Sequence, residues 1–350
     1  FHAEAGIRDP LWSRGLGDVY KRQVNKIETE DEKLIRAKTI YKDFESYGYT
    51  KEYLNEGIEQ YNDFINFHFN VEFNGRTAND DIYDINDTNY GNSNINNIKD
   101  SESHSTHVSG IISGDRHNKD GNKGINNLVE IMVLRAIPNG DEYDKDVARA
   151  IRYAVDNGAR IINGSFGKYF SSNPEWVIDA IRYASDNDVL VIAAAGNESK
   201  DLDSLSNDNY PSDQFFNKNE FSNTFIKVGA SSINLDENFT AYFSNYGKIN
   251  VDIFAPGVDI YSSVPNNKYK FQSGTSMASP VVSGIASLIM SYFPKLSAKK
   301  VKEIILESGI DIDIKIGNLG GNKHFREYSK SGKLVNAYNA LILASRSKRK

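Results

Sequence analysis

The heptapeptide at 274–280, GTSMASP, constrains the fold more than any other stretch of the chain. It opens an apolar run from Val281 to Phe293 in which apolar residues cover nearly all sides of a helix. Pro280 stands about one turn into this helix, where a missing backbone N–H costs least. The pattern therefore predicts a buried helix, which needs a large core around it.

The remaining sequence can supply that core. Helical patterns are predicted at 147–158, from Asn173-Pro174 onward, at 297–308 and at 335–344. Short apolar runs lie between or before them, at 128–137, 159–166, 189–195 and 225–230. Near-continuous apolar strands separated by helices are typical of a parallel sheet covered on both faces. We therefore expect an α/β fold with a mostly parallel central sheet flanked by helices.

Ser276 lies in the first turn of the predicted buried helix. The free N–H groups of a helix N-terminus favour negative charge, which a serine nucleophile needs where an oxyanion develops. A plain helix cap is the alternative interpretation. Two further segments decide between these interpretations.

The first segment is HSTHVSG at 104–110, which supplies a candidate base. A serine hydroxyl is a weak nucleophile until a base accepts its proton. His104 opens a helical pattern, and His107, one turn later, is expected to point elsewhere. Two histidines so spaced also raise the alternative of zinc, although the usual zinc motif has them at i and i+4 with a glutamate between.

The second segment is AAAGNES at 193–199, in which an apolar strand ends in a glycine and an amide. The NH₂ group of Asn197 is a candidate donor to an oxyanion. Beside the serine and histidine segments, this interpretation is favoured over a plain turn.

Together these three segments resemble the motifs of the subtilisin-like serine peptidases, the subtilase family. The order of histidine before serine also fits the family's order of aspartate, histidine and serine. The resemblance implies a subtilisin-like three-layer sandwich. It implies Ser276 as nucleophile, His104 as general base and acid, and Asn197 with the Ser276 backbone N–H as oxyanion donors.

Other stretches fit landmarks of the same family. NGSFG at 163–167 resembles the substrate-binding strand, in which Ser165, Phe166 and Gly167 would pair with extended substrate. Phe166 and the wall at Ala193–Gly196, which includes Ala194, would form an apolar first pocket, so uncharged hydrophobic residues are expected before the cut. FSNYG at 243–247 and APG at 255–257 match segments before the serine.

The triad aspartate is the one departure that matters. The family places it on a strand of the form apolar-apolar-Asp-Ser/Thr-Gly upstream of the histidine, and no such strand is found. The aspartates upstream of the histidine sit in helix or loop patterns, and none is assigned to the triad: Asp63, Asp80, Asp81, Asp84, Asp87 and Asp100. The resemblance implies that the missing strand lies inside the sheet. We therefore expect an empty slot between two strands, and a chain that is inactive as given.

The domain organisation follows from the same patterns. Residues 1–23 resemble a translated sequencing adaptor, so a lost N-terminus with its signal peptide and pro-segment is expected. Residues 24–103 are predicted as a helical insertion, in which His68 packs, followed by an acidic loop. Residues 104–345 are predicted as the catalytic domain, continuous with 24–103.

Composition limits the partners and cofactors. A net charge of −6 gives no reason to expect nucleic acid or an anionic membrane as a partner. No cysteine is present, which removes disulfides, thiol catalysis and cysteine-bound zinc. No apolar run approaches the ~18 residues of a membrane span. The chemistry requires no cofactor. Structural calcium at 115–122 is an alternative to a solvated turn there, and no metal ligand is assigned.

The resemblance implies a secreted or periplasmic monomer that acts on polypeptides as a serine endopeptidase. One rival hypothesis is a pseudoprotease, or inactive fragment, that binds peptides without cutting them. Another is a metal-dependent hydrolase using His104, His107 and loop carboxylates. The intact serine and asparagine motifs disfavour the metal hypothesis, and the adaptor-like start disfavours an evolved pseudoprotease.

Overall fold

The computed structural model describes residues 30–46, 58, 61–62, 64–73, 75–76, 78–96, 102–138, 140–215, 219–317 and 319–347. The chain divides into two compact units, Phe1–Gly75 and Arg76–Lys350. The adaptor-like residues 1–23 lie outside the described part. The boundary between the units falls before the acidic loop, so this loop groups with the larger unit.

The first unit is helical where it is described. Helix α2 (Glu32–Ser46) confirms the helical pattern predicted there, and a π-helical turn, η1 (Phe64–His68), follows later. The rings of Phe67 and Phe73 lie 4.8 Å apart, at the end of this turn. The side chain of His68 is outside the described part, so its packing role stays a prediction.

The second unit is built around a six-stranded sheet. Its strands occur in the order β1 (Ile161–Gly164), β2 (Leu190–Ala194), β3 (Phe225–Ser231), β4 (Ile253–Pro256), β10 (Lys333–Leu334) and β7 (Ile310–Asp311). All neighbouring pairs are parallel except β10 with β7. The predicted mostly parallel sheet is confirmed.

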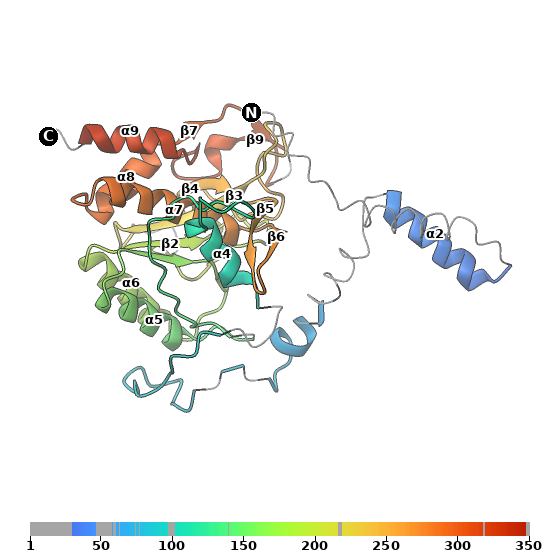
Figure 1. The fold of residues 1–350 in the computed structure, drawn as a ribbon, viewed down its shortest axis with the longest axis horizontal. Coiled ribbons are helices and arrows are strands. Elements are labelled where there is room, and N and C mark those ends of the chain that lie inside the picture. Colours follow the sequence, from blue (N-terminus) through green and yellow to red (C-terminus); the bar gives the residue numbers. More distant parts are fainter. Residues whose placement is uncertain are drawn as a thin grey trace. The chain divides into compact units, whose positions relative to one another are not determined.

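Helices cover both faces of this sheet (Figure 1). Helices α5 (Asp144–Asp156) and α6 (Pro174–Asp186) cover one face, and α7 (Thr275–Tyr292), α8 (Ala298–Ser308) and α9 (Ala337–Ser347) the other. Side chains alternate along a strand. Leu190 and Ile192 accordingly pack in the core on the α7 side, whereas Val191 and Ala193 pack on the α5 side. The fold is therefore the expected three-layer α/β/α arrangement.

Helix α7 is the buried helix that the heptapeptide predicts. Most of its residues are buried, Pro280 among them, and it packs against strands β1 to β4. Its neighbour α8 begins at the predicted cap, where Ser297 accepts a hydrogen bond from the Lys300 N–H at 3.2 Å. The sheet positions the N-terminal end of α7 beside the carboxyl ends of the strands.

Smaller elements complete the unit. Helix α4 (His104–Ser113) packs against α7 through Val108 and Met277. Two hairpins, β5 (Ile260–Val264) with β6 (Lys268–Gln272) and β8 (Lys315–Ile316) with β9 (Lys323–His324), lie outside the main sheet, and a 3₁₀ turn, η2 (Phe325–Glu327), follows β9. The sequence did not predict the first hairpin, whose turn uses positive φ at Asn266 and Asn267.

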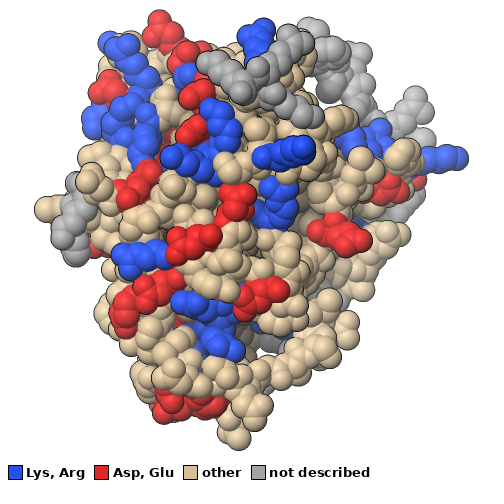
Figure 2. All heavy atoms as spheres, turned by 90° about the vertical axis from the view of Figure 1, so that its left-hand side faces the viewer, with Lys and Arg blue, Asp and Glu red and all other residues tan. Residues whose placement is uncertain are grey.

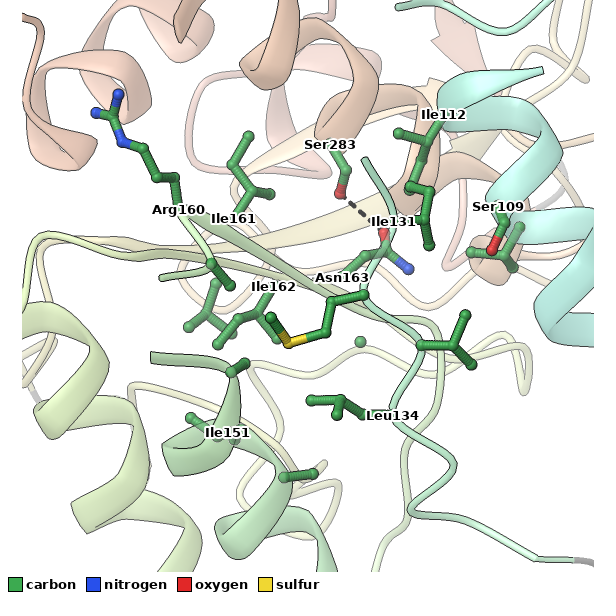
Figure 3. Close-up of a pocket in the computed structure, with 18 of the residues that line it drawn as sticks. Ser109, Ile112, Ile131, Leu134, Ile151, Arg160, Ile161, Ile162, Asn163 and Ser283 are labelled. Atoms are coloured by element: carbon green, nitrogen blue, oxygen red, sulfur yellow. Dashed lines mark hydrogen bonds between the residues drawn. The ribbon is translucent and has the colours of Figure 1, made fainter. Parts of the chain in front are cut away.

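One predicted strand is absent. Residues 128–137 are described as an extended segment outside any strand, and Leu128 is 79% exposed. Between this segment and β1 lies a cavity of about 660 Å³, which we call the slot. Figure 3 shows Ile131 and Leu134 facing it from the segment, and Ile161 lining it from β1. The segment forms no strand because it has no neighbouring strand to pair with.

The loop at 78–96 contains no helix or strand where it is described, as its composition predicted. Ion pairs tie it to the start of α5. Arg76 binds Asp146 through two nitrogens at 2.7 and 2.9 Å, and Lys145 pairs with Asp80. The Tyr90 hydroxyl donates to Asp146 at 2.8 Å. These contacts explain why the loop belongs to the second unit.

The surface of the second unit carries both signs of charge. On the face shown in Figure 2, basic and acidic side chains are interspersed over the described residues. Among the helices that the structure describes, none combines the length and apolar character needed to cross a membrane.

Candidate active site

The Ser276 side chain lies where α7 meets β1. Its hydroxyl donates to the Ser165 carbonyl at 3.1 Å, and the Ser165 hydroxyl donates to the Ser276 carbonyl at 2.8 Å. Asn163 supports this pair, because its NH₂ donates to the Ser165 hydroxyl at 2.9 Å. The structure therefore brings the predicted nucleophile against the first residue of the predicted substrate-binding strand.

Asn197 is oriented by the residue before the serine. The Thr275 N–H and hydroxyl both donate to Asn197 Oδ1, at 2.8 and 2.9 Å. Because a backbone N–H can only donate, the atom that it meets must be the amide oxygen. The NH₂ end of Asn197 is thus turned away from Thr275 and is left as a donor.

The two predicted oxyanion donors border one small space. A methyl group placed on Gly274 would lie 3.5 Å from Asn197 Nδ2 and 3.6 Å from the Ser276 backbone nitrogen. Ser276 is the second residue of its helix, so its N–H has no carbonyl partner within the helix. An oxygen bound near this point would be within reach of both donors.

The turn after β2 carries the other predicted wall residues. Ala194 is buried at the end of β2, and Gly196 follows with a φ of +102°. The Gly196 N–H donates to the Thr275 hydroxyl at 3.0 Å. This bond links the turn to the start of α7, so Thr275 holds both Asn197 and Gly196.

His104 is the first residue of α4 and is exposed. The preceding residue, Ser103, accepts a hydrogen bond from Gln272 Nε2 at 3.2 Å, four positions before Ser276. The first turns of α4 and α7 therefore lie in one region. Among the described residues, the recorded hydrogen bond of the Ser276 hydroxyl goes to Ser165 and not to His104.

Within the described part of the chain, no carboxylate contributes to the pKa shift of His104. The protein around its ring lowers the pKa of His104, and the neighbouring His107 lowers it further. An aspartate beside the ring would act in the opposite direction and raise this pKa.

The described aspartates upstream of His104 are engaged elsewhere. Asp80 is paired with Arg76 and Lys145, and the others accept backbone N–H groups within the loop: Asp81, Asp84 and Asp87. Asp63 and Asp100 lie outside the described residues. The structure thus brings none of the described aspartates to the histidine.

His107 contacts the β5–β6 hairpin. It is fully buried, and its Nε2 lies 3.0 Å from the Lys270 carbonyl oxygen. No group of three or more histidine, aspartate and glutamate side chains in the described part of the chain is arranged to hold a metal ion. In the candidate calcium loop, Asp115 accepts the His117 N–H at 2.9 Å.

Glu142 lies beside Gly167, one of the predicted substrate-binding residues. Its carboxyl group accepts a hydrogen bond from the Gly167 backbone, and burial raises the pKa of Glu142 to about 7. Phe166 turns the other way and lines the slot. No motif marks Glu142, because only the fold brings residue 142 beside residue 167. Thr275, by contrast, stands inside the heptapeptide, and its hydroxyl was the available clue.

The chain is similar in sequence to known proteases over 60% to 67% of its length. It is 38% identical over 211 residues to a thermophilic serine proteinase of Bacillus sp. (strain AK1), covering 60% of this chain and 46% of that protein. It is 35% identical over 234 residues to the cell wall-associated protease of Bacillus subtilis (strain 168), covering 67% of this chain and 24% of that protein. The chain therefore spans less than half the length of each.

Solved structures agree in fold. The prenylagaramide maturation protease PagA matches with a TM-score of 0.53 and 28% identity, over 69% of this chain and 82% of that chain. A protease from Pseudoalteromonas arctica matches with a TM-score of 0.56 and 25% identity, over 69% and 70%. The sequence model described as the subtilase family matches residues 43–331. With its serine, asparagine and histidine segments gathered at one end of the parallel sheet, the chain belongs to the subtilase family.

Proposed function

We propose that this site is that of a serine endopeptidase, which cleaves peptide bonds through an acyl-enzyme on Ser276. The observation that carries the proposal is that Asn197 Nδ2 and the Ser276 backbone nitrogen lie 3.5 and 3.6 Å from one point beside Gly274. Preorganised donors at such a place stabilise the oxyanion of acyl transfer. No metal or cofactor has a step in this chemistry.

The proposed reaction uses Ser276, His104 and Asn197. The Ser276 hydroxyl leaves the Ser165 carbonyl, passes its proton to His104 and attacks the substrate carbonyl carbon. Asn197 and the Ser276 N–H bind the resulting oxyanion, and His104 returns the proton to the leaving amine. A water molecule then gives a proton to His104 and attacks the acyl-enzyme, and His104 returns the proton to Ser276 as the carboxylic acid product leaves. Extended substrate pairs with Ser165–Gly167, and an uncharged, hydrophobic residue precedes the cut.

We propose that the carboxylate for His104 comes from a strand outside the described residues. The slot supports this, because β1 ends the sheet there and the apolar segment 128–137 lies unpaired on its far side. Without that strand His104 lacks a group to fix its tautomer. The chain as given is then inactive, and the alternative is a chain that binds peptides without cutting them.

The wider role is also a proposal. We place the protein as a monomer, secreted or periplasmic, acting on polypeptides and needing no cofactor, with calcium at most a structural ion. The relatives' names include both a cell wall-associated and a major intracellular protease of Bacillus subtilis, so their names do not decide the location.

A fluorophosphonate probe tests the nucleophile. It should label Ser276 and no other serine when an aspartate-bearing strand is supplied. Ser276→Ala should abolish labelling, while the exposed neighbour Ser273→Ala serves as the matched control and should keep it. Labelling that survives Ser276→Ala contradicts the assignment. Labelling without peptide turnover, even with the strand supplied, favours the peptide-binding alternative.

A further inference from the structure

A buried amide from another part of the chain holds several groups of the turn that carries Asn197. Asn245 is fully buried, and its Oδ1 accepts the Glu198 N–H at 3.2 Å and the Lys200 N–H at 2.8 Å. Its Nδ2 donates to the Ala195 carbonyl at 2.8 Å. The Asn245 backbone N–H donates to the Gly196 carbonyl at 2.9 Å. These bonds bracket Asn197 on both sides.

This turn needs stabilising contacts because its backbone conformation is unfavourable by itself. Gly196 has a φ of +102° and Ser199 a φ of +57°. A non-glycine residue with positive φ costs free energy and persists only where surrounding contacts impose it. Residues 197–199 are exposed, so packing from the core does not impose the conformation. Hydrogen bonds supply the constraint: the Asn245 amide holds Glu198 and Lys200, and the Ser199 N–H donates to the Phe243 carbonyl at 2.8 Å.

A second group of contacts reaches the substrate-binding side. The Asn245 NH₂ also lies 2.6 Å from the Tyr169 hydroxyl and 2.9 Å from Glu198 Oε2. The Tyr169 hydroxyl donates to the same Glu198 carboxylate, and the Lys200 ammonium lies 3.7 Å from the centre of the Tyr169 ring. Tyr169 stands two residues after Gly167. The network therefore joins the oxyanion turn to the strand proposed to hold substrate.

We propose that Asn245 is a positioning residue for the oxyanion hole. It sets residues 195–200 so that Thr275 can take the amide oxygen of Asn197 and leave Nδ2 for the oxyanion. Asn245 acts only through Asn197, so this inference rests on the proposed role of Asn197. Its position in the FSNYG segment gives no hint of this role, because the turn it holds is about fifty positions upstream.

A double-variant cycle measures the dependence. With the strand supplied, the readouts are the second-order rate of fluorophosphonate labelling of Ser276 and the kcat and KM on a peptide. Asn245→Ala should lower the labelling rate and kcat about 10- to 100-fold with little change in KM, less than the ~10²–10³ of a lost donor. In an Asn197→Leu background the same change should add almost nothing, because the group it positions is gone.

The matched control is Asn250→Ala. The Asn250 NH₂ donates at 3.0 Å to the Leu202 carbonyl and at 3.0 Å to the Asp203 carboxylate, both beyond the 195–200 turn. It should leave the labelling rate within about twofold. Equal losses from Asn245→Ala in both backgrounds would show a general folding role and overturn the proposal. If Asn197→Leu itself has no effect, the proposed oxyanion donor fails, and this inference fails with it.

Hydrogen exchange, measured with the strand supplied, provides a readout that needs no reactivity. In Asn245→Ala the amides of Glu198 and Lys200 lose their acceptor and should exchange at least about tenfold faster, while the β2 and β3 amides keep their protection. Asn250→Ala should leave both sets unchanged. Unchanged exchange at Glu198 and Lys200 in Asn245→Ala would contradict the positioning role even if the labelling rate falls.

Discussion

Thr275 fixes which end of the Asn197 amide faces the reaction. Its N–H and hydroxyl both donate to Asn197 Oδ1, so the amide can present only its NH₂ to the reaction. The sequence identified Ser276 and Asn197 from local motifs. It did not identify what orients them, because hydrogen bonds between residues 78 positions apart exist only after folding.

The first residue-scale prediction concerns Asn197→Leu. Leucine is close in volume but cannot donate, so the oxyanion loses one of two donors while the bound substrate loses little. With the strand supplied, kcat should fall about 10²–10³-fold, the loss known for this donor in subtilisin, itself a subtilase. Steady-state kinetics on a peptide substrate measure it. A raised KM at unchanged kcat would mean that Asn197 only shapes the turn.

The second residue-scale prediction concerns Glu142, whose pKa is raised to about 7, first by burial. A carboxyl with a raised folded pKa binds its proton more tightly in the folded state. Its contribution to stability is therefore full below its unfolded pKa, near 4.5, and is lost as pH rises through about 7. Glu142→Gln should melt higher than the parent at pH 8 and at the same temperature at pH 4.

The control for this pH dependence is Glu307→Gln, which neutralises an exposed glutamate. It should shift the melting temperature little at either pH. Thermal denaturation monitored by circular dichroism between pH 4 and pH 8, with the strand supplied, gives the comparison. A Glu142→Gln melting curve that parallels the parent at every pH would contradict the burial of an ionised carboxylate beside Gly167.

At the scale of elements, helices and strands with both an apolar pattern and neighbours to pack against were predictable. The patterns at 189–195 and 225–230 became β2 and β3, because each found a parallel partner on both sides. The pattern at 128–137 is equally apolar, yet no strand forms there. A strand is a property of a pair, so its sequence alone does not establish it.

The element-scale prediction is that the slot accepts a strand. A peptide Val-Ala-Val-Ile-Asp-Ser-Gly should pair with β1 and with residues 129–134, raising the melting temperature and accelerating labelling of Ser276. The matched peptide with asparagine in place of its aspartate should stabilise equally but should not accelerate labelling. Acceleration by both peptides would show that reactivity is limited by ordering of the site when a strand fills the slot, and not by the carboxylate. No stabilisation by either would mean that the slot does not hold a strand.

At the scale of the whole molecule, the three-layer arrangement followed from alternating apolar strands and helices, and it was confirmed. The hairpin of β5 and β6 and the short strands β7 to β10 were not predicted. These elements are two to five residues long, and their positions depend on turns and on contacts with distant strands. Short elements carry too little periodicity to be found from sequence.

The whole-molecule prediction is that residues 24–350 expressed alone aggregate or remain partly unfolded, and do not hydrolyse casein. Each buried N–H or C=O left unpaired along the slot costs about 1–3 kcal/mol. A few of them equal the stability of an ordinary domain, about 5–15 kcal/mol. Size-exclusion chromatography and a casein assay test this. A soluble, cooperatively melting and fully active chain would show that one of the upstream aspartates serves the triad.

The bond from the Ser276 hydroxyl to the Ser165 carbonyl makes reactivity a question of side-chain populations. A hydroxyl that donates to a carbonyl cannot at the same time donate to an imidazole. The nucleophile therefore exchanges between a resting rotamer, bonded to Ser165, and an armed rotamer, bonded to His104. The observed rate is then the intrinsic rate multiplied by the armed fraction. An aspartate beside His104 would act partly by enlarging that fraction, before any bond to the substrate has begun to form.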